Sequence, residues 1–431
     1  MAQSRRQEIA GTVGNVLEWY DFAVYGFLAP VIGPQFFPHD DPLTALINTY
    51  GIFAAGYLMR PLGGVVFGHI GDRMGRKRAL QISMTMMAVP TVIVGLLPVY
   101  KDAGVAAPVM LVVMRLVQGV SVGGELVGSM SYLVETAPPR RSGLAGSWSV
   151  CGGVGGILLG SLVVAIMESI LDGRGMMVWG WRVPFLAGIV IFAIGKWLRQ
   201  SLEETPDFLS AEQPGGSGPG PLVELLRDMP GRVVHLSVCI LLFAAGFYTL
   251  FVWMPAYLTD IVDPPVEHAL QINTLAMVLL LVMIPAGGLL ADRMGARPVM
   301  LASTALLATS VYPVFVIIDH GVMWQAAAAQ IWFAVLVGLL QGPVPSFMVK
   351  SFPIRNRYTA IGISYNLTLA LVGGTAPMVG TWLVKTTGDK ASPALYLALL
   401  GVFSLVGLML HAPDRGDLSA SVVRDAGSRP L

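Results

Sequence analysis

The sequence predicts an all-α protein that crosses a membrane many times. Of its 431 residues, 55% are hydrophobic and only 12% are charged, whereas soluble domains carry about 25% charged residues. The mean hydropathy is +0.69. This composition excludes disordered, fibrous, nucleic-acid-binding and ordinary cytosolic proteins. The net charge of +1 implies no bulk electrostatic partner. The apolar composition makes the lipid bilayer the expected surrounding.

A membrane-spanning helix needs about 20 mainly apolar residues. Twelve runs of roughly that kind follow one another, at residues 10–33, 45–71, 79–99, 108–135, 142–168, 182–199, 233–258, 268–291, 299–318, 323–350, 358–385 and 393–411. Their apolar residues do not alternate with polar ones, which excludes a closed transmembrane barrel. We therefore expect a polytopic protein with twelve transmembrane helices.

Most of the 27 Lys and Arg residues fall on one side of the predicted membrane. The loops of the other side hold Lys101, Arg174, Lys385 and Lys390. Because basic loops remain in the cytoplasm, we expect a multi-pass protein of the cytoplasmic (inner) membrane with both termini in the cytoplasm. The first run is not predicted to be a cleaved signal peptide, because it carries acidic residues and lacks a small-residue cleavage site.

A polar segment and an internal repeat divide the chain into two halves. Residues 200–232 include EQPGGSGPGP, a flexible linker composition. They separate a six-helix bundle at 1–199 from a second at 233–411, which is followed by a tail at 412–431. The loop after the second run reads GHIGDRMGRKR, and the loop after the eighth reads GLLADRMGARP. Two such halves, related as parallel repeats, predict an alternating-access transporter with its site between them.

The repeated loop resembles the signature of the major facilitator superfamily. GNVLEWYDFAVYG, YLMRPLGG, RLVQGVSVGGE, WGWRVPFL and SLEETPDF resemble its metabolite:proton symporter branch. The resemblance covers nearly the whole chain and implies the major facilitator fold. It also implies a cytoplasmic gate at Gly68, Asp72, Arg73, Arg76, Lys77, Asp292, Arg293 and Arg297. Asp72 would pair across the interface of the halves and cap a helix N-terminus; the simpler alternative is a basic loop with a turn glycine.

The fourth run carries one polar stripe. Arg115, Gln118, Ser121 and Glu125 recur three or four residues apart, and Ser129 and Tyr132 continue the series. A charged side chain facing lipid costs several kcal/mol, so this stripe is expected to line a cavity or to pair with charge. Hydrogen bonding between helices is the alternative for the serines.

The first run adds Glu18, Asp21 and Tyr25. We expect Arg115 to bind Asp21 or a substrate carboxylate, while Glu18, Asp21 or Glu125 carries the proton. Substrate and proton can then compete for one arginine, which couples their movements. A static network of ion pairs is the alternative.

Further substrate contacts are expected from Gln118, Ser121, Tyr25 and Tyr57 in the first half. In the second half, Tyr248 and Trp253 on the seventh run and Tyr365 and Asn366 on the eleventh are the candidates. Aromatic residues in membrane helices also serve in packing and interface belts, and that reading stays open for each of them. Arg60, which precedes Pro61, either lines the cavity or pairs with a neighbouring helix.

The predicted function is proton-coupled symport of a small organic acid by alternating access. WLVKTTGDKASP resembles citrate and tricarballylate transporters, and the short tail lacks the coiled coil that osmolyte symporters of the branch often carry. The alternative is a zwitterionic osmolyte such as proline or betaine. No enzyme motif and no nucleotide loop occur. We expect no catalytic residue, no cofactor, no metal site and no nucleic-acid partner, and a protein that functions as a monomer.

Overall fold

The structure is a computed structural model that describes residues 16, 18–38, 41–74, 76–122, 125–138, 140–200, 225, 227, 229–353 and 357–411. Helices make up nearly all of these residues, and no strand occurs among them. The predicted all-α class is therefore confirmed. The helices up to residue 200, called the first half below, are the stretch 18–27, α2 (Ala29–Phe36), α3 (Pro42–Leu58), α4 (Arg60–Met74), α5 (Arg76–Leu96), α6 (Tyr100–Ala103), α7 (Ala106–Ser121), α8 (Glu125–Glu135), α9 (Ser142–Ile170), α10 (Gly173–Gly175), the π-helical turn η1 (Met176–Gly180) and α11 (Arg182–Gln200).

The remaining helices are called the second half. They are α14 (Pro230–Cys239), α15 (Leu241–Phe247), the π-helical turn η2 (Tyr248–Trp253), α16 (Met254–Asp260), α17 (Ala269–Met294), α18 (Ala296–Ile318), α19 (Met323–Gln341), α20 (Val344–Lys350), α21 (Arg357–Thr368), the π-helical turn η3 (Leu369–Gly373), α22 (Ala376–Thr387) and α23 (Ser392–Leu410).

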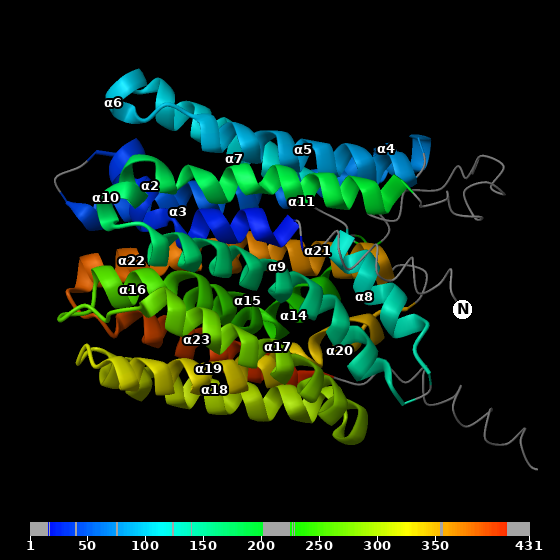
Figure 1. The fold of residues 1–431 in the computed structure, drawn as a ribbon. Coiled ribbons are helices and arrows are strands. Elements are labelled where there is room, and N and C mark those ends of the chain that lie inside the picture. The colour runs from blue at the N-terminus through cyan, green and yellow to red at the C-terminus, as the bar shows by residue number, and fades with distance from the viewer. Residues whose placement is uncertain are drawn as a thin grey trace, which may run out of the picture.

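The long helices run side by side, and most of the first-half helices lie above the second-half helices in the view of Figure 1. The two halves meet along α9 and α17 and along α3 and α22. We call the end of the molecule that holds the start of α9 the Asp292 end, after the residue that binds there. The opposite end, where α22 finishes beside the start of α3, is the Lys385 end.

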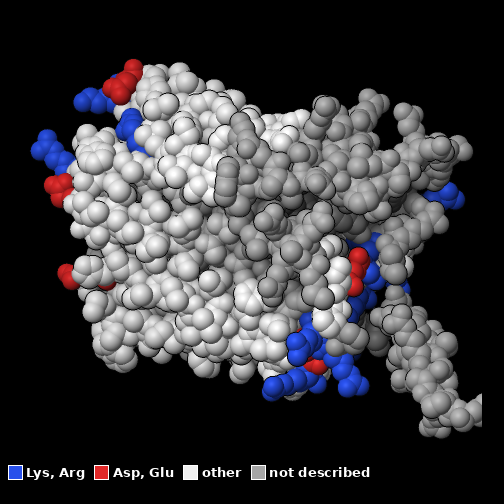
Figure 2. Space-filling view, turned by 45° about the vertical axis from the view of Figure 1, so that its right-hand side comes forward, with Lys and Arg blue, Asp and Glu red and all other residues white. Residues whose placement is uncertain are grey.

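The outer surface suits a lipid bilayer. Eight helical stretches of the described chain are long and apolar enough to cross a membrane, and a bent pair, Gly173–Gly180 with Arg182–Ile194, makes a ninth. Large apolar side chains face outward on these helices; Leu275 and Leu410 are each 72% exposed. In Figure 2, charged residues gather toward the two ends of the visible face, and a broad band of other residues separates them. Such a band matches the hydrocarbon core of a membrane.

Within the residues that the structure describes, each of the twelve predicted runs coincides with one helix or with a series of helices broken at a turn. The second run, for example, breaks at Met59, directly before Arg60 and Pro61. The fourth run also breaks, because Val122 adopts an extended conformation after α7. The predicted polar stripe is therefore not continuous, and Tyr132 on α8 is 42% exposed.

Glycines allow the two halves to touch where α9 crosses α17. A Cβ atom on Gly143 would collide with the carbonyl oxygen of Gly288, and one on Gly288 would collide with that of Gly143. Since both obstacles are backbone atoms in packed helices, neither can move aside, and the close crossing depends on the absence of side chains.

Candidate functional site

Arg115 is enclosed within the first half. Its Nη1 donates hydrogen bonds to Asp21 Oδ2 and to Gln118 Oε1, both at 2.9 Å. The guanidinium carbon lies 4.6 Å from the ring centre of Phe22 and 4.5 Å from that of Tyr25. These contacts leave Arg115 fully buried. The predicted pairing of Arg115 with Asp21 is present in the structure.

Neighbouring polar groups extend this network only a short way. Gln118 Nε2 donates to Thr91 Oγ1 at 2.9 Å, which ties α7 to α5. Ser121 Oγ donates to the carbonyl of Gln118 at 2.6 Å, a bond within its own helix. Tyr25 donates to the carbonyl of Thr49 at 3.1 Å. These hydrogen bonds connect helices of the first half, but Asp21 Oδ1 and the Nε and Nη2 atoms of Arg115 are buried without hydrogen-bond partners in the described structure.

Arg60 occupies the interface between the halves. Its Nη2 lies 3.5 Å from Glu18 Oε1, and its Nε donates to Asn366 Oδ1 on α21 at 3.3 Å. The guanidinium also lies 5.1 Å from the ring of Trp19. Its Nη1 is buried without a hydrogen-bond partner among the described residues. A buried donor of this kind is costly unless a ligand or water satisfies it.

A cavity lies between the halves; Arg60 does not line it but contacts the lining residue Trp19. The cavity is lined by Trp19, Leu126, Val150, Gly153, Val154, Ile157, Phe243, Phe247, Tyr248, Gln341, Tyr365 and Leu369. Five of these twelve residues are aromatic, and one of them, Trp19, contacts Arg60. Among the lining residues, the indole Nε1 of Trp19 and the Oε1 of Gln341 are buried without hydrogen-bond partners in the described structure. The cavity therefore combines an aromatic wall with one unused donor and one unused acceptor.

The predicted substrate residues divide into two groups. Tyr248 and Tyr365 line the cavity, Tyr57 donates to Tyr248 across the halves at 2.9 Å, and Asn366 binds Arg60. Arg115, Gln118, Ser121, Tyr25 and Trp253 are not among the lining residues. Trp253 donates to Thr381 Oγ1 at 2.9 Å, an interaction within the second half. The side chain of Glu125 lies outside the described part of the structure.

Several lining residues were not predicted from the sequence. Trp19 belongs to the quoted motif GNVLEWYDFAVYG, which was a usable signal. Phe243 and Phe247 lie four residues apart on α15, but single apolar residues in an apolar helix carry no distinct signal. Gln341 on α19 is buried. Its position as a polar residue within an apolar run was a usable signal in the sequence, because such residues are often functional.

At the Asp292 end, one carboxylate joins the halves. Asp292 Oδ1 accepts a hydrogen bond from the backbone N–H of Gly143 at 2.6 Å, and Oδ2 accepts one from Leu144 at 2.9 Å. These donors belong to the first turn of α9, whose N–H groups have no partner within the helix. The carboxylate also complements the positive end of the helix dipole.

Other predicted gate residues lie elsewhere. Arg297 donates to the carbonyls of Leu408 and Met409, at 2.7 Å and 2.6 Å, and thus remains within the second half. Arg293 is exposed. Gly68, Asp72 and Arg73 fall on α4 and Arg76 and Lys77 on α5, but their side chains lie outside what the structure describes. A further link across the halves was not predicted: Arg357 Nη1 donates to Glu135 Oε1 at 2.9 Å.

At the Lys385 end, an unpredicted ion pair joins the halves. Lys385 Nζ on α22 lies 2.6 Å from Asp41 Oδ2, at the start of α3. Asp41 also caps α3 by accepting from the backbone N–H of Leu43 at 3.0 Å. The hydrogen bond from Lys385, supported by one from Thr44, lowers the pKa of Asp41 to about 2. The two halves are therefore joined by contacts at both ends of the molecule.

The comparisons agree with this architecture. The family described as Sugar (and other) transporter matches residues 9–214. A D-xylose–proton symporter has a structure with a TM-score of 0.75 at 20% identity, covering 95% of this chain and 98% of that one. A partially occluded, inward-open xylose transporter from E. coli also reaches 0.75, at 18% identity, covering 96% of this chain and 99% of that one.

Curated relatives are more similar in sequence. The proline/betaine transporter of Salmonella typhimurium is 35% identical over 412 residues, which cover 93% of this chain and 82% of that protein. The chain belongs to the major facilitator superfamily. A glycine betaine/proline/ectoine/pipecolic acid transporter of Dickeya dadantii is 34% identical with the same coverage. The chain is thus a multi-pass membrane transporter and not an enzyme. The names of these relatives match the osmolyte alternative better than the predicted organic acid.

Proposed function

We propose that the protein is a proton-coupled symporter for a zwitterionic osmolyte of the proline and betaine class. The observation that carries this proposal is the aromatic lining of the central cavity beside a single buried arginine. Rings of Trp19, Tyr248 and Tyr365 offer the negative π faces that attract substituted ammonium groups. The names of the curated relatives support the same class of substrate. This replaces the citrate-like substrate that the sequence predicted.

Charge balance also favours a zwitterion. Each of the two buried arginines described in the first half is next to a carboxylate, Arg60 beside Glu18 and Arg115 beside Asp21. A tricarboxylate would bring several negative charges into a site whose cations are already matched. An unmatched buried charge is strongly unfavourable, whereas a zwitterion adds no net charge.

We place the substrate carboxylate toward Arg60 and the ammonium group against the aromatic wall. Arg60 Nη1 and the indole N–H of Trp19 are the buried donors without partners on that side. Gln341 Oε1 is a buried acceptor, which suits the N–H groups of proline but finds no donor on a quaternary betaine. Proline and betaine should therefore differ in their need for Gln341.

Coupling follows from the position of Glu18. When a substrate carboxylate binds Arg60, Glu18 loses its cationic partner in a dry site and is more readily protonated. Binding of substrate and proton then favour each other, as a symporter requires. Asp21 and Arg115 form a second pair one turn further along the first helix, with Glu125 as a third candidate for carrying the proton.

We also retain the predicted arrangement in the cell. The Asp292 end, with its basic loops, is placed in the cytoplasm together with both termini, in the inner membrane. The bundles at 1–199 and 233–411, joined by 200–232 and followed by the tail 412–431, would rock about the central cavity in a functional monomer.

The test is uptake into proteoliposomes that contain the purified protein. An inward proton gradient should drive uptake of labelled betaine or proline, sodium should not be required, and citrate should neither enter nor compete. Tyr365→Leu should weaken betaine binding about tenfold to thirtyfold, whereas Tyr365→Phe, which keeps the ring, should bind normally. Proton-driven uptake of citrate without uptake of either zwitterion would overturn the proposal.

A further inference from the structure

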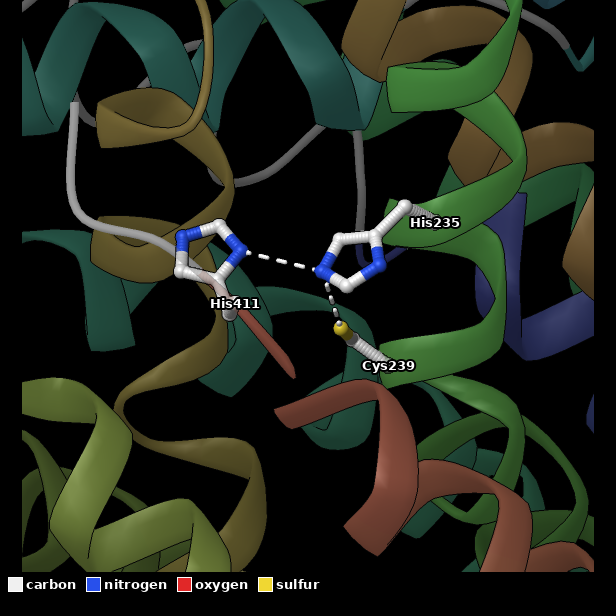
Figure 3. A group of neighbouring side chains, drawn as sticks. All are labelled: His235, Cys239 and His411. Atoms are coloured by element: carbon white, nitrogen blue, oxygen red, sulfur yellow. Dashed lines mark hydrogen bonds between the residues drawn. The ribbon is translucent and has the colours of Figure 1, made fainter. Parts of the chain in front are cut away.

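Three potential metal ligands meet at the Asp292 end of the second half, away from the central cavity. His235 and Cys239 lie on α14, and His411 directly follows α23. Figure 3 shows the three side chains pointing toward one another, with both dashed contacts ending on one nitrogen of His235. His411 Nδ1 lies 3.3 Å from His235 Nε2, and Cys239 Sγ lies 3.6 Å from the same atom. All three ligand atoms lie within 4.8 Å of one another.

These separations match the edges of a tetrahedral zinc site. Zinc binds histidine nitrogen at about 2.0–2.1 Å and cysteine sulfur at about 2.3 Å, so tetrahedral angles place two nitrogens about 3.3 Å apart and a nitrogen and a sulfur about 3.6 Å apart. The two measured contacts therefore leave room for one ion between the side chains. The spacing of His235 and Cys239, four residues apart, puts both on one face of the helix.

We propose that His235, Cys239 and His411 form a binding site for a divalent transition-metal ion of the Zn²⁺ class. Imidazole and thiolate ligands favour zinc and its chemical neighbours over Mg²⁺ and Ca²⁺, which prefer oxygen. Three protein ligands leave the fourth position for water. The sequence alone predicted no metal site, because His411 is far from the other two ligands in the chain and becomes their neighbour only through folding.

The surroundings hold the ligands in place. Arg297 donates to the carbonyls of Leu408 and Met409 and thereby fixes the end of α23 just before His411. The ring of Phe347 lies 4.6 Å from that of His411. The C-terminal carbonyls of α23 favour a nearby cation, which partly offsets the positive charge of Arg297. Positioning of this kind raises affinity, because less freedom is lost when the ion binds.

A bound ion would join the first and last helices of the second half. The helix breaks directly after Cys239, at Ile240, where α14 ends and α15 begins. If the seventh predicted span bends at this break during transport, α14 must be free to move relative to α15. We therefore expect metal binding at this site to slow transport without occupying the central cavity.

The test measures Zn²⁺ binding by the whole protein, purified without a histidine tag. Calorimetry should detect one site, and Co²⁺ in its place should give the visible absorption of a tetrahedral ion together with a thiolate charge-transfer band. Cys239→Ser and His411→Ala should each weaken binding roughly tenfold or more. The matched controls are Cys151→Ser, which removes the other cysteine, and His320→Ala, at the Lys385 end; both should bind as the unaltered protein does.

Transport measurements provide an independent test of the metal site. Micromolar Zn²⁺ should slow substrate uptake by the unaltered protein and by Cys151→Ser, but not by Cys239→Ser. The proposal is overturned if the unaltered protein binds Zn²⁺ no better than Cys239→Ser, since the three residues would then form only a hydrogen-bonded cluster. Binding that persists in both ligand variants would place the ion at another site and would equally overturn it.

Discussion

Two buried arginines in the first half differ in what surrounds them. Arg115 is held by Asp21, by Gln118 and by two aromatic rings, all from its own half. Arg60 instead contacts Asn366 of the second half and Trp19 of the cavity lining. Both arginines keep buried donors without partners in the described structure, Nη1 of Arg60 and Nε and Nη2 of Arg115, so the contacts and not the free donors distinguish them. A binding role therefore fits Arg60 better, whereas Arg115 fits a role in coupling and in stabilising the first half.

This difference predicts opposite outcomes for the two Arg→Lys variants. Lysine cannot reproduce the planar two-point grip of a guanidinium on a carboxylate. Arg60→Lys should lose tenfold or more in betaine affinity and retain a near-normal melting temperature, because the positive charge beside Glu18 remains. Arg115→Lys should lower the melting temperature and proton coupling more than affinity. Ligand-induced thermal shifts measure both effects, and unchanged affinity in folded Arg60→Lys protein would exclude Arg60 from the site.

The sequence predicted part of the Arg115 network. Arg115 and Gln118 lie three residues apart on one helical face, whereas the contact of Arg115 with Asp21 joins two helices and was predicted as one of two alternatives. The contacts of Arg60 and the cluster of His235 with His411 depend on how distant helices pack, which periodicity within one run does not encode. The break at Val122 was also missed, because an apolar run continues through it.

Among the elements, α9 is held by the opposite half at its first turn. Its first turn binds Asp292, and Gly143 touches Gly288 in the same crossing. A helix cap of this kind was predicted for Asp72 of the first repeat, and the described structure contains one at Asp292 of the second. The side chain of Asp72 lies outside the described residues, so its own cap remains a prediction.

Asp292→Asn should weaken this cap and open the Asp292 end. The asparagine oxygen can still accept one hydrogen bond, but the charge-assisted pair of bonds to Gly143 and Leu144 is lost. Cysteines introduced near the start of α9 should become more reactive toward a water-soluble reagent, and net uptake should slow. Asp319→Asn is the control, because Asp319 pairs with Lys390 inside the second half at the opposite end. Equal reactivity in the two variants would contradict the gating role.

At the scale of the whole molecule, the two halves are joined by contacts at both ends. Asp292 acts at one end, and Asp41 with Lys385 acts at the other. Alternating access requires that these contacts break one at a time, since a transporter open at both ends would leak. Each contact therefore biases the equilibrium between conformations in the direction opposite to the other.

Lys385→Ala should accordingly shift the protein in the opposite direction to Asp292→Asn. Removing the lysine leaves Asp41 as the cap of α3 but releases α22, so the Lys385 end opens more often. Labelling of cysteines placed near Thr44 should increase, and labelling near the start of α9 should fall. Lys390→Ala is the matched control, because it removes a lysine at the same end without touching the interface of the halves. The same labelling pattern in both lysine variants would refute the assignment.

The pKa of Asp41 decides whether this contact senses pH. The hydrogen bond from Lys385 lowers that pKa from 3.8 to about 2. The ion pair therefore stabilises the folded protein fully above the unperturbed pKa of Asp41, and this stabilisation is lost only as the pH falls through the lowered pKa. Between about pH 5 and pH 8 the carboxylate stays ionised. Asp41→Asn should therefore increase the labelling of cysteines at the Lys385 end by the same factor at about pH 5 and at about pH 8. A pH-dependent increase would mean that this pair contributes to proton coupling, which we assign instead to the buried carboxylates near Arg60 and Arg115.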